Sequence, residues 1–181
     1  MLLSEDYREQ LVEMHKPRRD GRTWGATACR KIYDLIPWIC RDGVPEKLLD
    51  YGSADGKFQY QARRRGLLTE TEIIEYDPAF PEKAKNNIPC ERVMCIDVLE
   101  HIEPEFLDDV LKDLHRCTEG YGVFDIALFL SGLMLPDGRD SHLIIEKPHW
   151  WKEKLGKYFE VLDSEMGGPK GHYLRVYVKR I

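Results

Sequence analysis

Several features of common protein classes are missing from this 181-residue sequence. It contains no apolar run near the roughly 18 residues that a membrane-spanning helix needs. Its start, MLLSEDYREQ, is acidic and amphipathic, which is untypical of a secretory signal. It has neither a P-loop, G-x-x-x-x-G-K-[ST], nor the G-x-S-x-G elbow of many hydrolases. We therefore expect a cytoplasmic protein that is not a hydrolase of the G-x-S-x-G type.

Cysteine pairs and strong positive charge are also absent. The five cysteines are odd in number and none has C-x-x-C spacing, so we expect free thiols and no zinc site built on cysteine. The net charge of −5 argues against a general nucleic-acid binder. The basic stretch HKPRRDGR at 15–22 is the local exception, and a solvated loop explains it better than a phosphate contact.

Apolar periodicity divides the chain into alternating elements. A hydrophobic fraction of 43% and a charged fraction of 33% are typical of one globular domain. The patterns predict helices over 4–15, 26–40, 57–65, 103–118 and 149–159, and strands over 47–51, 72–77, 91–97, 121–130, 159–165 and 172–180. Such alternation predicts an α/β fold, a doubly wound and mostly parallel sheet. The last two strands are close enough to pair as an antiparallel hairpin.

Acidic residues stand at three expected strand ends. Asp50, Asp77 and Asp97 each end a strand, and ligands of open α/β sheets bind outside the carboxyl ends of the strands. Each acid alone is explained well enough as a helix cap or a turn residue. Three in succession favour a binding site.

The loop after the first of these strands, GSADG at 52–56, permits close approach of a ligand to the backbone. Asp77 follows Gly52 by 25 residues, near the ~20-residue offset at which an acid contacts ribose in dinucleotide folds. The loop is not G-x-G-x-x-G, and Asp55 would repel a pyrophosphate. A cationic or zwitterionic nucleoside therefore suits it better than NAD, and a nicotinamide oxidoreductase is disfavoured.

Three motifs in order resemble the class I S-adenosylmethionine-dependent methyltransferases, in particular the small "methyltransferase type 11" branch of bacteria and phages. They are LLDYGSADG, IIEYDP and CIDVLEHIEPEFLDDVLKDLHR, and the resemblance covers about residues 45–180. It implies a Rossmann-like fold, S-adenosyl-L-methionine as cofactor, and one methyltransferase domain over 1–181. Within that domain, 1–42 would form a helical lid and 43–181 the Rossmann-like core.

The resemblance also implies which residues hold the cofactor. Asp50 would bind its amino group, the glycine loop would pass its methionine part, and Asp77 would accept both ribose hydroxyls. The full expected set is Trp24, Asp50, Tyr51, Gly52, Ser53, Asp55, Gly56, Asp77, Pro78, Asp97 and Val98.

The sequence departs from the family pattern in three places. Ala54 replaces a glycine of the loop, and the acidic Asp55 is unusual there. Only 20 residues separate Asp77 from Asp97, where the family usually fits a helix, a strand and an acid that contacts adenine. We therefore expect a shortened third-strand region, with altered adenine contacts.

Three residues are expected to act in catalysis: His101 as the base, with Glu100 and His142. For His101, a packing role at the start of the next helix is an equally good explanation. His142 lies in LPDGRDSHLIIEKPHWW at 135–151. This stretch follows the strand expected over 121–130, which corresponds to the family's fifth strand, and there the family binds its acceptor. We expect no metal ion. The alternative is that Asp97, Glu100, His101 and His142 bind Mg²⁺ or Mn²⁺, since D-x-x-E-H is similar to the E-x-x-E-H signature of metal-dependent small-RNA 2′-O-methyltransferases.

The expected activity is methyl transfer to a small-molecule or sugar-like acceptor. The N-P-P-Y tetrapeptide of the base-amino methylating branch is absent after Asp97, which argues against that substrate class. Two alternatives remain open: an RNA methyltransferase of the 2′-O type that uses HKPRRDGR, and a non-catalytic protein that keeps the fold for binding. A nucleic-acid partner is not favoured, a membrane is not expected, and the sequence specifies no oligomeric state.

Overall fold

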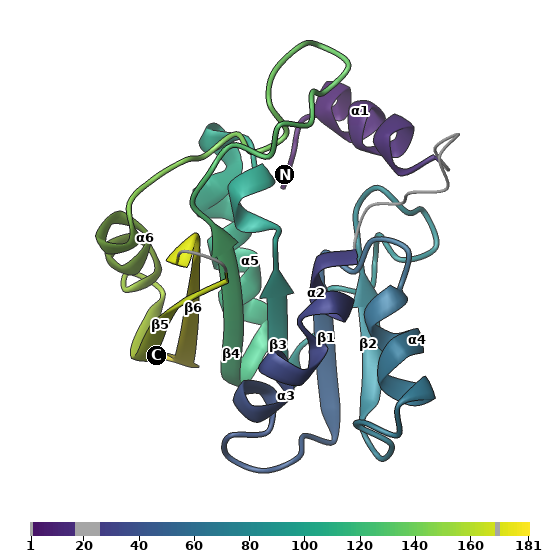
Figure 1. Ribbon diagram of the computed structural model, residues 1–181, viewed down its shortest axis with the longest axis vertical. Helices are drawn as coiled ribbons and strands as arrows, with labels where there is room; N and C mark the ends of the chain where they lie inside the picture. Colours follow the sequence, from purple (N-terminus) through teal and green to yellow (C-terminus); the bar gives the residue numbers. More distant parts are fainter. Residues whose placement is uncertain (1, 17–25, 169–170) are drawn as a thin grey trace.

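A six-stranded mixed sheet forms the centre of the protein (Figure 1). The computed structural model describes residues 2–16, 26–168 and 171–181. Its strands are β1 (Lys47–Tyr51), β2 (Glu72–Tyr76), β3 (Cys90–Ile96), β4 (Thr118–Ala127), β5 (Phe159–Gly167) and β6 (Tyr173–Arg180). Its helices are α1 (Glu5–His15), α2 (Ala26–Arg30), α3 (Ile32–Ile39), α4 (Lys57–Arg64), α5 (Leu107–Cys117) and α6 (Pro148–Leu155), with short 3₁₀ helices η1 (Leu99–His101) and η2 (Pro104–Phe106).

Across the sheet, the hydrogen-bonded strands follow one another in the order β2-β1-β3-β4-β6-β5. β1 through β4 are parallel, whereas β6 runs antiparallel to both β4 and β5. This confirms the predicted mostly parallel sheet with reversed strands at its end. Residues 77–89 hold only turns and irregular backbone, so β2 is an edge strand and the shortened third-strand region is confirmed.

The two faces of the sheet carry separate apolar cores. On one face, α5 presents Leu107, Val110, Leu111 and Leu114 at helical spacing, and α6 adds Trp151. On the other face, α3 packs against β1 and α4 through its buried residues Ile32, Leu35 and Ile39. The alternating faces of β1, β2, β3, β4 and β6 supply both cores, as expected for a doubly wound sheet.

The range 1–42, expected as a lid, has two different environments. α1 lies across the carboxyl ends of the strands (Figure 1), and Thr27 and Ala28 of α2 line the cavity there, whereas α3 belongs to the core. Ser4 caps α1 by accepting a hydrogen bond from the Tyr7 N–H at 3.1 Å, as its sequence predicts. Within the described part of the chain, no helix has the length and apolarity that crossing a bilayer requires.

Two predicted helices are shorter than expected. The helix expected over 26–40 is divided into α2 and α3 at Lys31, whose ammonium group reaches Asp125 in β4. The helix expected from residue 103 begins as η2 at Pro104 and becomes α-helical only at Leu107. Proline has no N–H to donate, which is tolerated at such a first turn.

A buried ion network joins the helical layer to the sheet. Asp125 is fully buried and lies 2.8 Å from both the Lys31 ammonium and the Arg175 guanidinium. Arg175 also pairs with Glu165 at 2.9 Å, and Lys31 lies over the ring of Tyr173. The network therefore fixes α2–α3 against β4 and β6, beside the ends of the central strands.

Asp125→Ala should lower the free energy of unfolding by about 3–5 kcal/mol, because it leaves the buried Arg175 and the half-buried Lys31 without their shared carboxylate. Asp163→Ala is the matched control, since the Asp163–Arg41 pair is about half exposed and should contribute about 0–1 kcal/mol. Urea unfolding of both variants measures the difference. Equal effects would contradict the importance of the buried network.

Candidate active site

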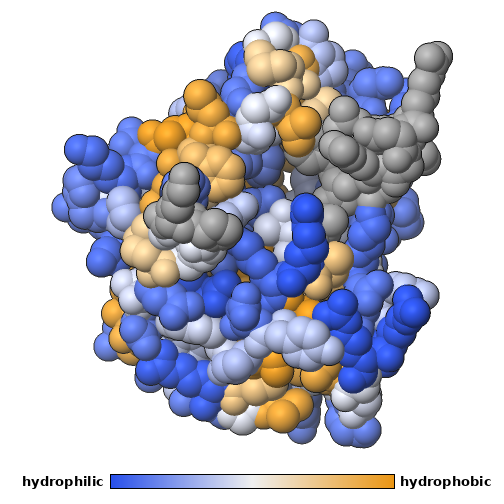
Figure 2. Space-filling model, viewed as in Figure 1, coloured by the Kyte–Doolittle hydropathy of each residue, from blue (hydrophilic) through white to orange (hydrophobic). Residues whose placement is uncertain are grey.

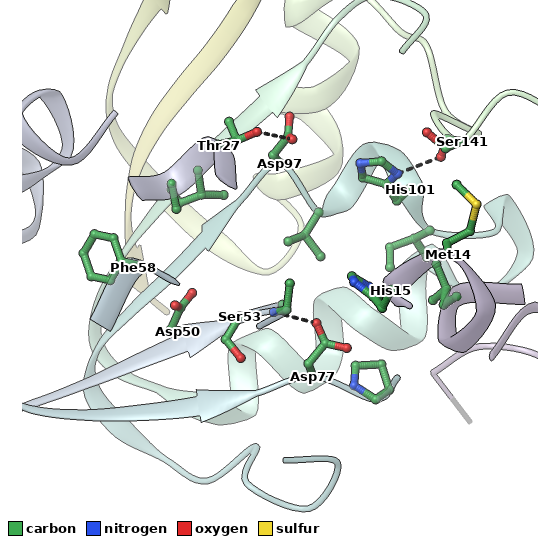
Figure 3. A pocket seen from close by; sticks show the side chains of 18 of the residues that line it. Met14, His15, Thr27, Asp50, Ser53, Phe58, Asp77, Asp97, His101 and Ser141 are labelled. Carbon is green, nitrogen blue, oxygen red and sulfur yellow. Dashed lines mark hydrogen bonds between the residues drawn. The ribbon is translucent and has the colours of Figure 1, made fainter. Parts of the chain in front are cut away.

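A cavity opens at the carboxyl ends of β1, β2 and β3, beneath α1 (Figure 3). It encloses about 930 Å³ of empty space, part of it open to solvent. The lining residues are Tyr7, Leu11, Met14, His15, Thr27, Ala28, Asp50, Gly52, Ser53, Ala54, Phe58, Asp77, Pro78, Ile96, Asp97, Val98, His101, Ile102, Leu135 and Ser141. All three strand-end acids are thus brought to one cavity, as the sequence predicts.

Backbone geometry explains the composition of the loop after β1. Gly52 has φ +85°, and a Cβ there would overlap the side chain of Val98. Gly56 has φ +76°, and a Cβ there would overlap the carboxylate of Glu75. Ala54 also has a positive φ, +47°, a conformation that costs an alanine energy but that its small side chain tolerates.

The carboxylate of Asp77 holds this loop in place. Its Oδ2 accepts the Ala54 N–H at 2.9 Å, and its Oδ1 accepts the Ala79 N–H at 2.9 Å. The Gly52 N–H also donates to the Tyr76 carbonyl at 2.8 Å. The loop is therefore joined to the end of β2 by backbone as well as side-chain hydrogen bonds.

The shortened segment between β2 and β3 closes the other side of the loop. The Lys83 ammonium donates to the Ala54 carbonyl at 2.7 Å and pairs with Glu75 at 3.0 Å. A turn segment without a strand thus still supports the loop.

Several buried polar atoms at the cavity have no hydrogen-bond partner among the described residues. They are Asp50 Oδ2, Ser53 Oγ and Asp97 Oδ1. Leaving such groups unsatisfied costs about 1–3 kcal/mol each, more for charged groups. Their positions, near the loop and the end of β3, point to a ligand with complementary donors.

The floor of the cavity is formed by Asp97, which has φ +61°. Its N–H donates to the Asp125 carbonyl at 2.8 Å, and its Oδ2 accepts from the Thr27 hydroxyl at 2.8 Å. These two contacts hold the residue in a backbone conformation that few non-glycine residues adopt.

His101 lies on η1 and contacts the loop that follows β4. Its Nδ1 is 2.7 Å from the Ser141 carbonyl, which only accepts, so Nδ1 carries the proton. Burial lowers the pKa of His101 to about 4, against the opposing effect of the Asp97 charge. His101 is therefore a neutral imidazole at neutral pH. The Tyr7 hydroxyl donates to its carbonyl at 2.6 Å and so fixes α1 on η1.

No family model and no curated protein matches this sequence. Solved structures match over nearly the whole chain. One is the 1,6-didemethyltoxoflavin-N1-methyltransferase of Burkholderia thailandensis with bound S-adenosylhomocysteine, with a TM-score of 0.67 and 18% identity over 96% of this chain and 87% of that one. Another is the N-methyltransferase NodS of Bradyrhizobium japonicum, also with S-adenosylhomocysteine, with a TM-score of 0.63 and 12% identity over 96% and 98%.

A third match is the magnesium protoporphyrin IX methyltransferase of Synechocystis with bound S-adenosylhomocysteine, with a TM-score of 0.58 and 14% identity over 98% of this chain and 95% of that one. The chain has the Rossmann-like fold of the class I S-adenosylmethionine-dependent methyltransferases. At these identities, the likeness concerns the fold alone.

Some residues expected to bind the cofactor lie away from the cavity. Tyr51 faces the opposite side of the sheet, where its hydroxyl donates to Asp113 on α5 at 3.0 Å. Asp55 is exposed and pairs with Lys57 at 2.7 Å, and Gly56 does not line the cavity. Trp24 lies outside the described residues, as does most of the basic stretch at 15–22. Asp50, Gly52, Ser53, Asp77, Pro78, Asp97 and Val98 all line the cavity.

The residues expected in catalysis are divided between two layers. His101 lines the cavity, whereas Glu100 and His142 are buried behind its wall. The rings of His101 and His142 lie edge to face, with centroids 4.5 Å apart. Of these three residues, His101 is therefore the one whose side chain reaches the cavity.

Four residues of α1 line the cavity although no sequence motif marks them: Tyr7, Leu11, Met14 and His15. The apolar face at Leu11 and Met14 predicted a helix but did not show what that face covers. Ser4 also tethers α1, because its hydroxyl and N–H donate to Glu103 at 2.7 and 2.8 Å.

Burial raises the pKa of Asp50 from the usual 3.8 to about 8, with a further contribution from the charge of Glu75. Asp77 acts in the same direction, and Lys83 opposes it. A carboxyl with a raised pKa keeps a proton in the folded protein that the unfolded chain has released. The stability that the carboxyl of Asp50 contributes is therefore lost as the pH rises from about 4 to 8.

Asp50→Asn should remove this loss, so the variant should gain stability relative to the parent as pH rises through that window. We expect the difference to reach about 1 kcal/mol or more, or roughly 2–4 °C in Tm. Urea unfolding at pH 5, 6.5 and 8 checks it. Parallel pH profiles for the two proteins would show that Asp50 titrates normally.

Proposed function

We propose that the protein is a methyltransferase that transfers a methyl group from S-adenosyl-L-methionine to a small-molecule or sugar-like acceptor. One observation carries the proposal: Asp50, Asp77 and Asp97 surround one cavity with the glycine loop, and two of them present buried oxygens without partners. Such a cavity suits a ligand that brings both cationic groups and hydroxyl donors.

The residues present fit this cofactor. Asp50 Oδ2 would accept a hydrogen bond from its ammonium group, and Ser53 Oγ lies beside the loop along which the methionine part would pass. Each oxygen of Asp77 already accepts one N–H and keeps a lone pair for a ribose hydroxyl. When bound, the cofactor supplies a sulfonium-linked methyl group.

The adenine end of the site would be built differently from the family pattern. Because residues 77–89 form no strand, an adenine-contacting acid after a third strand is missing. Pro78, Met14 and Ile102 line the cavity along with Asp77. An apolar wall from α1 and η1 would therefore replace that contact.

Methyl transfer requires mainly that the protein orient the cofactor and the acceptor. An in-line displacement is accelerated mainly by holding the two reactants together, and α1, fixed by Tyr7, limits access of water to the cavity. His101, neutral at pH 7, would accept a hydrogen bond from the acceptor and take up its proton. Glu100 and His142 would act behind it, by fixing the position of Asp97 and His101.

The acceptor class rests on the surroundings of the cavity. The loop between β4 and α6 exposes Leu130, Leu133 and Met134, and apolar groups gather at the same end of the molecule as α1 (Figure 2). The matched structures include enzymes named for small-molecule acceptors, a toxoflavin precursor and magnesium protoporphyrin IX. A cytoplasmic location belongs to the proposal, since the five free cysteines suit a reducing compartment.

Two departures from the family pattern favour the non-catalytic alternative, the alanine at position 54 and the shortened segment after Asp77, but both are compatible with an intact loop. Ala54 adopts the positive φ that the loop needs, and the shortened segment supports the loop through Lys83. The RNA alternative rests on a basic stretch that lies mostly outside the described residues.

Asp77→Ala should weaken binding of S-adenosylmethionine and its demethylated product about 100-fold or more, since two hydrogen bonds to a carboxylate are lost. Asp55→Ala is the matched control and should bind like the parent, because Asp55 is exposed and outside the cavity. Calorimetric titration measures both, and circular dichroism checks folding.

If the parent protein bound neither S-adenosylmethionine nor its demethylated product, the enzyme proposal would be wrong and the non-catalytic alternative would be favoured. Binding that Asp77→Ala leaves intact would instead reject the assigned site.

Met14→Ala should weaken binding of the same two ligands about tenfold, because part of an apolar wall of the adenine site is removed, a cost of about 1.5 kcal/mol. Glu13→Ala, on the exposed side of the same helix, should leave the affinity unchanged. Titration with adenosine alone gives the second readout. An unchanged adenosine affinity in Met14→Ala would contradict the role of α1.

A further inference from the structure

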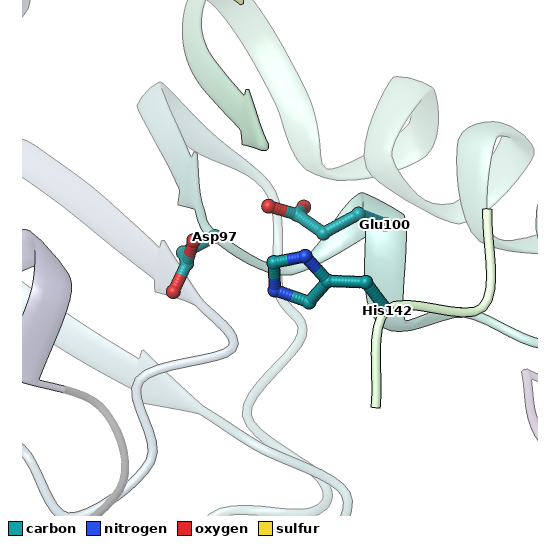
Figure 4. Close-up of side chains that lie close together, drawn as sticks. All are labelled: Asp97, Glu100 and His142. Carbon is teal, nitrogen blue, oxygen red and sulfur yellow. The ribbon is translucent and has the colours of Figure 1, made fainter. Parts of the chain in front are cut away.

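Three side chains of metal-ligand type meet at the floor of the cavity (Figure 4): Asp97, which lines it, and the buried Glu100 and His142. Asp97 ends β3, Glu100 lies on η1, and His142 belongs to the loop between β4 and α6. One ligand atom from each lies within 4.8 Å of the other two. Segments far apart in the sequence thus converge on one point.

The two carboxylates at this point are incompletely satisfied. Glu100 is fully buried; its Oε1 accepts the Ala127 N–H at 2.6 Å, whereas its Oε2 has no partner among the described residues. Asp97 likewise uses Oδ2 for Thr27 and leaves the buried Oδ1 without one. Two neighbouring carboxylates in a buried setting repel each other unless a cation or a proton lies between them.

The third side chain is oriented as a ligand. His142 Nδ1 lies 2.6 Å from the Phe129 carbonyl, which only accepts, so Nδ1 carries the proton and the lone pair is on Nε2. Metal-binding histidines commonly donate their other N–H in this way, which fixes both tautomer and ring direction. Figure 4 shows the imidazole turned toward both carboxylates.

We propose that Asp97, Glu100 and His142 bind one divalent transition-metal ion. Two carboxylates and one imidazole suit Mn²⁺ or Zn²⁺ better than Mg²⁺, which prefers oxygen ligands only. The ion would tie the loop after β4 to the floor of the cavity, because Asp97 and Ser141, the neighbour of His142, both line it. The proposal replaces the expectation of a metal-free protein and does not depend on the cofactor.

The test is titration of MnCl₂ alone into protein freed of metal by a chelator, followed by calorimetry and by the electron paramagnetic resonance signal of bound Mn²⁺. The parent protein should bind one ion per chain, with Mg²⁺ at least tenfold weaker. Glu100→Gln and His142→Asn should each weaken Mn²⁺ binding about 10- to 100-fold or more. Glu146→Gln and His149→Asn change the same residue types at exposed positions and should bind like the parent.

Thermal unfolding provides a second readout that also checks folding. Glu100→Gln keeps an oxygen for the Ala127 N–H, so it should fold, and Mn²⁺ should raise the Tm of the parent but not of this variant. No Mn²⁺ or Zn²⁺ binding by the parent at millimolar concentration would overturn the proposal. Binding that both variants retain would also overturn it. Binding of S-adenosylmethionine is measured separately on the same proteins, so failure of the metal site and failure of the cofactor site can be told apart.

Discussion

The two hydrogen bonds that Asp77 accepts are the constraint on which the site depends. A carboxylate at the end of β2 fixes Ala54, and with it the glycine loop at the end of β1. The same group holds Ala79, where the chain turns into the segment that carries Lys83. The Asp77 side chain therefore sets the relative position of two strand ends, and its oxygens keep lone pairs that can accept hydrogen bonds from a ligand in the cavity.

Asp97 has a corresponding structural role at the floor of the cavity. Its positive φ is stabilised by the hydrogen bond to the Asp125 carbonyl, and the Asp125 side chain is held by Lys31 and Arg175. The backbone conformation of Asp97 is thus supported by the buried ion network around Asp125. Such strain persists where the surrounding structure fixes it, which is typical of binding sites.

The sequence predicted most of the fold because its signals are local. The apolar spacing in α5 and the short apolar run of β1 identify their elements without reference to the rest of the chain. Acids at the ends of parallel strands must meet at one sheet edge, so Asp50 and Asp77 were assigned together. Strand alternation also explains why Tyr51, next to Asp50, faces the other side.

What the sequence determined by itself was the α/β order, the short segment after Asp77 and the acids around one cavity. Only the tertiary structure decided which residues of α1 reach this cavity, that Asp55 pairs with Lys57 outside it, and that His142 rather than His101 completes the cluster with Asp97 and Glu100. The physical reason is distance along the chain: Tyr7 contacts a residue 94 positions away. No local pattern of side chains encodes such a contact, because it forms only when the layers pack together.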